Sequence, residues 1–236
     1  MPACRRDCRT VLCFQPCQWG ITAPRQKLFP GILLGLLCWG AWLSLSPPCQ
    51  SSEPAVNVTM IEEDWELVVH NPDPNITAPQ ISCVMSTDGT LDHLHAVLEL
   101  NCHSQPEFSP GGIQLQVWNG DQLVAVQNHS NRGALANNSE TIRWTMRMKL
   151  HDDNVTWSVR DVTSQTWGDF SSGLSVSAEA GQNHLNNYSA AHSQAKSGIG
   201  FASNRVHSLK ITRVRRYAGT TLVDEQSQPL IVHEQE

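Results

Sequence analysis

Charged residues are scarce in this chain, and basic residues are missing from a long part of it. Asp, Glu, Lys and Arg together make up 16% of the 236 residues, which is low for an ordinary soluble domain. No Lys or Arg occurs between Gln50 and Asn131. From residue 50 onward the sequence has 11 basic and 21 acidic residues, a net charge of −10. This acidic balance argues against nucleic acid as the partner, because proteins that bind nucleic acid gather positive charge.

The sequence also lacks the short motifs that accompany common catalytic chemistry. It has no Gly-rich phosphate loop, no serine nucleophile elbow and no activated Cys–His pair. Sustained helical periodicity is missing after residue 50. We therefore expect a protein that is not an enzyme, that is built from β-strands and that needs no cofactor.

One uncharged apolar segment stands out near the N-terminus. Residues 28–46 follow Arg25 and Lys27 and end before two prolines. A positive flank, an apolar run and a helix-breaking end indicate a signal sequence, although the run is nearly long enough to stay as a membrane anchor. We expect residues 1–49 to be an unstructured leader plus this hydrophobic export helix. The remaining chain is then extracytoplasmic: secreted, periplasmic or on the cell surface, touching a membrane only through an uncleaved N-terminal segment.

The cysteines suggest one disulfide. Cys83 and Cys102 share strand parity with apolar neighbours, so both point to an apolar face. Two cysteines in an exported domain favour a bridge, which would close a loop of about 20 residues and stabilise the fold by roughly 3 kcal/mol. The alternative is a pair of buried free thiols. Four further cysteines before residue 20 lack the close spacing of a zinc site, so we interpret them as part of the leader.

Alternation with a period of two recurs after residue 50 and predicts strands. The clearest case is residues 141–150, where Ile142 to Leu150 alternate with polar and basic side chains. Asn119-Gly120 is a strong hairpin signal between two such segments. We predict a two-sheet antiparallel β-sandwich over residues 50–219. Residues 220–236 are expected to form a loose polar C-terminal tail.

Charge predicts one specific strand pairing. The segment 61–67 is acidic, and the segment 210–216 is basic. Opposite charges on neighbouring strands stabilise their pairing. We expect these two segments to lie side by side and antiparallel.

Three stretches carry a resemblance to known proteins: DWELVV at residues 64–69, GGIQLQVW at 111–118 and GIGFASNRV at 198–206. They resemble an uncharacterised family of exported proteins of planctomycete-type bacteria. The pattern over residues 62–217 is similar to concanavalin-A-like or laminin-G-like jelly rolls. The resemblance implies a jelly-roll sandwich outside the cytoplasm and, from the wider fold, glycan binding or hydrolysis. It implies no functional residues, because the family has no assigned activity.

The acidic segment also permits a catalytic interpretation. Glu62, Asp64 and Glu66 share one face of a strand, as a carboxylate set for glycoside hydrolysis would require. The competing interpretation is the charge-paired strand described above, which we favour because a motif without structural context is weak evidence.

Two motifs could suggest metals, and we predict a metal for neither. His93 and His95 form an H-x-H pair that lacks a third ligand at a fixed spacing. Residues 152–154 (Asp-Asp-Asn) lack the full series of oxygen ligands for calcium, and a tight turn favours the same residues.

The best binding candidates are two tryptophans outside the apolar alternation of the strands. Trp118 is out of phase with the apolar residues before it, and Trp167 precedes Gly168 in a loop-like stretch. A flat exposed aromatic ring stacks well on a pyranose. Polar residues close to Trp118 in the sequence complete the candidate set: Asn119, Asp121, Asn128 and His129. The alternative is that both tryptophans cover the second sheet. We therefore expect a module that binds a glycan or a surface protein. A structural cell-surface or matrix protein is the second choice and a hydrolase the third.

Overall fold

The computed structural model describes residues 56–70, 79–101, 112–129, 139–165 and 167–235. The expected leader and export helix, together with Cys102, lie outside this part of the chain. The described residues belong to one unit that spans residues 51–236. Within them, no helix is long and apolar enough to cross a membrane.

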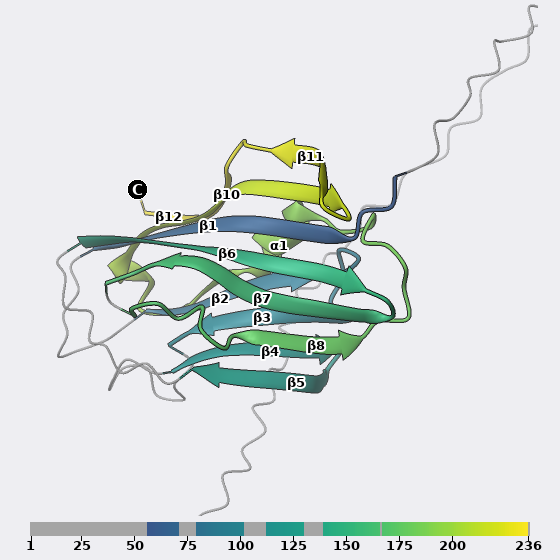
Figure 1. Cartoon of the computed structure of the whole chain (residues 1–236). Helices are drawn as coiled ribbons and strands as arrows, with labels where there is room; N and C mark the ends of the chain where they lie inside the picture. The colour runs from purple at the N-terminus through teal and green to yellow at the C-terminus, as the bar shows by residue number, and fades with distance from the viewer. Residues whose placement is uncertain (1–55, 71–78, 102–111, 130–138, 166, 236) are drawn as a thin grey trace, which may run out of the picture. The chain divides into compact units, whose positions relative to one another are not determined.

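The larger of two sheets has seven strands and is antiparallel throughout (Figure 1). Its order is β11-β10-β1-β6-β7-β8, with β12 also paired to β10. Its strands are β1 (Met60–His70), β6 (Ser139–His151), β7 (Asn154–Thr163), β8 (Ser175–Glu179), β10 (Val206–Ala218), β11 (Thr221–Gln226) and β12 (Leu230–Glu234).

The smaller sheet has five antiparallel strands in the order β5-β4-β3-β2-β9. They are β2 (Gln80–Ser86), β3 (Leu94–Leu100), β4 (Ile113–Asn119), β5 (Gln122–His129) and β9 (Gly198–Phe201). One short helix, α1 (Ala190–Lys196), and a single 3-10 turn at Ser203–Arg205 complete the described elements. Ser189 caps α1 by accepting a hydrogen bond from the backbone N–H of His192.

Alternating side chains produce one core between the sheets. Along β6 the apolar residues from Ile142 to Leu150 are buried, while Arg143 and Lys149 are exposed on the other face. The inward faces of β2, β3 and β4 contribute to the same core cluster. Trp65 of β1 stacks on its cross-strand neighbour Trp144 of β6, with ring centroids 6.0 Å apart. The predicted two-sheet antiparallel architecture is confirmed.

The predicted pairing between the acidic and basic segments is also confirmed. β1 and β10 are antiparallel neighbours, with Glu62 opposite Arg215 and Glu66 opposite Lys210. The Asn119-Gly120 hairpin forms as well: Gly120 has a φ of +55°, and β4 and β5 flank it. Each prediction succeeded because the relevant signal is local or involves direct cross-strand neighbours.

The C-terminal prediction was wrong. Residues 220–236 were expected to be a loose tail, but they contain β11 and β12, which pair with successive parts of β10. Gly219, with a φ of +61°, allows the tight turn into β11. β11 is exposed along almost its whole length, and β12 has only two partly buried apolar residues, Leu230 and Val232, so the alternation in this part of the sequence is weak.

The disulfide prediction is corrected for Cys83, the one of the two cysteines that the structure describes. Cys83 is a free and fully buried thiol in β2. The register supplies the reason: Cys83 lies opposite Leu98, and β3 ends at Leu100. A bridge needs two Cα atoms within about 7 Å, so the partner of Cys83 would have to be a near cross-strand neighbour.

Candidate ligand-binding face

The outer face of the seven-stranded sheet carries a row of three carboxylates on β1, each paired with two bases. The bases of Glu62 and Glu66 come from both neighbouring strands, and those of Asp64 both come from β10. Glu66 pairs with Arg143 of β6 at 2.6 Å and with Lys210 of β10 at 2.7 Å. Glu62 pairs with Arg147 of β6 and with Arg215 of β10. The carboxylates therefore alternate with bases across three adjacent strands.

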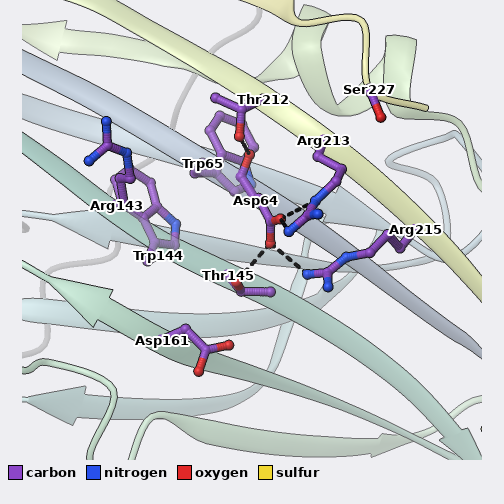
Figure 2. A pocket seen from close by; sticks show the side chains of 10 residues that line it. All are labelled: Asp64, Trp65, Arg143, Trp144, Thr145, Asp161, Thr212, Arg213, Arg215 and Ser227. Atoms are coloured by element: carbon purple, nitrogen blue, oxygen red, sulfur yellow. Dashed lines mark hydrogen bonds and ion pairs between the residues drawn. The ribbon is translucent and has the colours of Figure 1, made fainter. Parts of the chain in front are cut away.

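Asp64, at the centre of the row, has three side-chain partners. Figure 2 shows its side chain between Thr145 of β6 and two arginines of β10. The Thr145 hydroxyl donates to it at 2.8 Å, Arg213 at 2.7 Å and Arg215 at 2.8 Å. The Thr212 hydroxyl donates to the backbone carbonyl of Asp64 at 3.0 Å. We call the three carboxylates and their five basic partners the charge ladder.

The charge ladder explains the acidic motif without catalysis. Partial burial raises the pKa of Glu66, but hydrogen bonds and positive charge from Lys210 and Arg143 outweigh this effect and hold the pKa below its usual value. A glycosidase needs one carboxylic acid that stays protonated near neutral pH. The environment of Glu66 instead favours the ionised carboxylate.

Two open pockets lie on this same face. The first has a volume of about 570 Å³ and is lined by Asp64, Arg143, Thr145 and Arg213 among others. The second has a volume of about 680 Å³ and lies over β6, β7 and residues 171–175. Asp161 of β7 lines both pockets, so the two pockets adjoin at this residue.

The second pocket combines basic groups with hydroxyl groups. Lys149 and Arg160 contribute the exposed positive charges, and Thr156, Ser158 and Ser175 contribute hydroxyls. Cross-strand register explains the grouping, since Lys149 lies opposite Thr156 and Thr156 lies opposite Ser177. Such a surface offers both donors and acceptors to a polar ligand.

The binding residues predicted from the sequence do not form this face. Trp118, Asn119, Asp121, Asn128 and His129 belong to the β4–β5 hairpin of the smaller sheet. The hairpin separates them, because Asn119 and Asp121 lie at its turn and Asn128 and His129 at its other end, about 20 Å along the strands.

Trp118 faces outward from the smaller sheet, and its side chain is half-buried rather than fully exposed. It lies opposite His95 on β3, and its indole N–H donates to Gln116 at 2.7 Å. Asn128 is likewise occupied by a side-chain contact, accepting a hydrogen bond from Gln114 at 2.6 Å.

The prediction that Trp167 is an exposed stacking residue was wrong. Its side chain is 1% exposed and belongs to the core, as do Phe170 and Leu174. The segment that carries it has no regular alternation, so tertiary packing alone determines its burial. Trp118 and Trp167 cannot form a shared sugar platform, because one faces solvent and the other lies in the core.

The histidine motif does not gather ligands. His93 is exposed and contacts Asp88 at 2.5 Å, whereas His95 contacts the backbone carbonyl of His93 at 2.9 Å. Across the described ranges, no three His, Cys, Asp or Glu side chains are grouped as a metal site would require.

A buried carboxyl group lies on the opposite face of β1. Glu63 is fully buried and accepts hydrogen bonds from the Tyr188 hydroxyl at 2.5 Å and the Trp65 indole at 3.0 Å. Burial raises the pKa of Glu63 to about 7, even though these hydrogen bonds offset part of the rise. Buried Cys83 is close enough for the charge of Glu63 to add to the effect of burial in raising the thiol pKa.

The sequence contains a signal for the polar outer face but not for a site on it. The alternation along β6 already separates Arg143, Arg147 and Lys149 from the core residues, and β7 separates Ser158 and Arg160 in the same way. What the sequence lacks is the strand order that brings these outward faces together.

No protein-family model and no curated protein matches the chain.

Proposed function

We propose that this protein is an exported, non-enzymatic binding module whose ligand is a carbohydrate lying on the outer face of the seven-stranded sheet. The observation that carries the proposal is the position of the two pockets. Both open on this face, share Asp161 and are lined by charged and hydroxyl side chains. A sugar presents hydroxyls in every direction, and such side chains are suited to hydrogen bond with them.

The chemistry of the face favours binding over hydrolysis. Glu62, Asp64 and Glu66 are each held by at least two bases, which keeps their charges neutralised within the sheet. A rigid sheet also presents its side chains in fixed positions, and pre-organised groups lose less entropy on binding.

The proposal includes the features expected from the sequence. These are a concanavalin-A-like jelly-roll topology, kinship with the exported planctomycete-type family, export through residues 28–46, and an extracytoplasmic location. The two antiparallel sheets are compatible with this topology.

The test is glycan binding by the full chain and by two matched variants. Asp161→Asn keeps the side-chain shape and suits the left-handed backbone at this position, where φ is +52°. We expect it to weaken binding to an uncharged glycan about tenfold, because one charged hydrogen-bond acceptor is lost, and to strengthen binding to an anionic glycan, because a repelling carboxylate is removed. Asp121→Asn makes the same change at the β4–β5 turn and should leave affinity unaltered. Absence of binding to all glycans, or greater loss in Asp121→Asn, would contradict the proposal.

A second candidate function is assembly with copies of itself, and edge strand β5 favours it. Among the described residues β5 pairs only with β4, and it exposes Leu123 (45%), Val124 (47%) and Val126 (42%). β5 has no charged residue and no proline, so it lacks the usual protection of an edge strand. Two-fold antiparallel pairing centred on Ala125 would set Val124 of one copy opposite Val126 of the other.

Oligomeric state tests this second candidate. The full chain should sediment as a dimer, and Val124→Lys should convert it to a monomer, because each lysine would lie opposite apolar Val126 and diagonal to the like charge of the other copy. The matched control Leu222→Lys changes an equally exposed residue on β11 and should remain dimeric. A wild-type monomer would eliminate this candidate.

A further inference from the structure

Positive charge is concentrated on one face of an otherwise acidic domain. Residues 51–236 contain 11 basic and 21 acidic residues. Register and alternation assign seven of the 11 bases to the outer face of the seven-stranded sheet. They are Arg143, Arg147, Lys149, Arg160, Lys210, Arg213 and Arg215.

Five of these seven bases are committed to the charge ladder, and two are not. Lys149 of β6 and Arg160 of β7 are exposed, and no carboxylate in the described part of the chain forms an ion pair with either. Both line the second pocket. Their charges therefore remain available to a ligand, whereas those of the ladder stabilise the sheet.

The spacing of the two free cations suits a polymer. Lys149 lies opposite Thr156, and Arg160 follows Thr156 by four residues on β7. At about 3.3 Å per residue and 4.8 Å between strands, their Cα atoms are about 14 Å apart. Two long side chains at this spacing can contact separate anionic groups along one chain.

Hydroxyl groups of β7 and β8 lie between the two cations, beside Arg147 of the charge ladder. Ser158 lies between them on β7, opposite Ser175 of β8. Thr156 and Ser177 form a hydroxyl pair at 2.7 Å. Hydroxyls both donate and accept, so this strip matches the uncharged part of a sugar chain between its charged groups.

We infer that the ligand is an anionic polysaccharide, bearing carboxylate or sulfate groups, and that Lys149 and Arg160 bind those groups. This inference rests on the proposed glycan-binding function and names its substrate class. The free cations attract a polyanion to this face although the domain as a whole is acidic. A nucleic acid is disfavoured, because the lining of the second pocket contains no tryptophan, tyrosine or phenylalanine on which bases could stack.

The test uses polysaccharides that differ only in charge. The full chain is titrated with dextran sulfate and dextran, and with polygalacturonate and its methyl ester, at low and high salt. We expect binding to the charged member of at least one pair, at least tenfold weaker binding to its neutral counterpart, and loss of affinity as salt screens the charges.

Variants then locate the site. Lys149→Gln and Arg160→Gln should each weaken binding to the charged glycan about fivefold, and the double variant about 25-fold. Lys196→Gln removes one exposed charge from α1 and should leave affinity unchanged. All three positions are exposed, and thermal unfolding of each variant should match the parent.

The outcomes distinguish failure of the anionic-ligand inference from failure of the glycan-binding proposal. Equal binding to charged and neutral glycans, unaffected by the variants, would overturn this inference while glycan binding itself stands. No binding to any glycan would overturn both. Single-stranded DNA serves as a further polyanion, and tighter binding to it than to either charged glycan would replace the polysaccharide assignment with nucleic acid.

Discussion

Replacing Glu63 with glutamine isolates the free-energy cost of a carboxylate buried between the two sheets. Glutamine has the shape of the protonated acid. Its carbonyl can accept the Trp65 indole hydrogen bond, and its amide can donate to the Tyr188 hydroxyl. The variant therefore keeps the shape of the neutral acid and its hydrogen bonds to Trp65 and Tyr188 but cannot ionise.

The magnitude follows from the raised pKa. Burial moves the pKa of Glu63 from 4.5 to about 7 in the folded state. Below the unfolded value both states are protonated, and the stabilising effect is fully present. As pH rises from 4.5 to 7, the unfolded chain releases the proton first, so stability falls by about 1.4 kcal/mol per pH unit. Above pH 7 the loss levels off at about 3 kcal/mol.

The assay is urea unfolding of the full chain at pH 4 and pH 8. At pH 4 the parent and Glu63→Gln should unfold with nearly equal free energies, and at pH 8 the variant should be more stable by about 3 kcal/mol. Effects of the charge ladder at low pH are common to both proteins and cancel in the difference. Glu179→Gln, an exposed carboxyl on β8, is the control and should show no such pH-dependent gain. Equal parent–variant differences at both pH values would refute the reasoning.

Three further predictions concern the ladder, the core and the thiol. Glu66→Gln should lower the free energy of unfolding by about 1 kcal/mol at pH 7, and this difference should vanish as pH falls through the lowered pKa of Glu66. Urea titrations at pH 7 and pH 2.5 measure the difference. An undiminished difference at pH 2.5 would count against the charge ladder. Trp167→Ala should cost about 3–5 kcal/mol in unfolding experiments because it opens a cavity in the core, whereas an exposed side chain would cost almost nothing. Cys83 should resist alkylation in the folded protein and react in urea, as judged by mass spectrometry of its peptide; rapid labelling without urea, or a disulfide-linked peptide, would contradict a buried free thiol.

Much of the sandwich was predictable because its signals are local. The expected strand at residues 141–150 matches β6 at Ser139–His151, since each inward residue is apolar and each outward residue is polar. Opposite charges identified β1 and β10 as neighbours although about 150 residues separate them in the sequence. That pairing was predictable because cross-strand charges contact directly.

The failures arise where tertiary packing overrides local pattern. Trp167 lies in an irregular segment, and its burial depends on distant parts of the core. β11 and β12 form because β10 is long enough to pair with both along one edge. β11 has no buried face, and β12 has only the partly buried pair Leu230 and Val232 to reveal it in the sequence.

The candidate site could be found from the sequence only in part. Alternation assigns Lys149 and Arg160 to an outward face. It does not reveal that β1 supplies carboxylates to the arginines of β6 and β10 but none to these two residues. Distinguishing structural cations from available cations requires the strand order.

Chemical footprinting of Lys149 tests the central claim most directly. The full chain is reductively methylated with and without dextran sulfate, and the modified lysines are quantified by mass spectrometry. The account predicts that the ligand protects Lys149 on the outer face of the seven-stranded sheet and leaves Lys196 of α1 fully reactive. Equal reactivity of Lys149 with and without a bound ligand, or protection of Lys196 instead, would show that the ligand binds elsewhere.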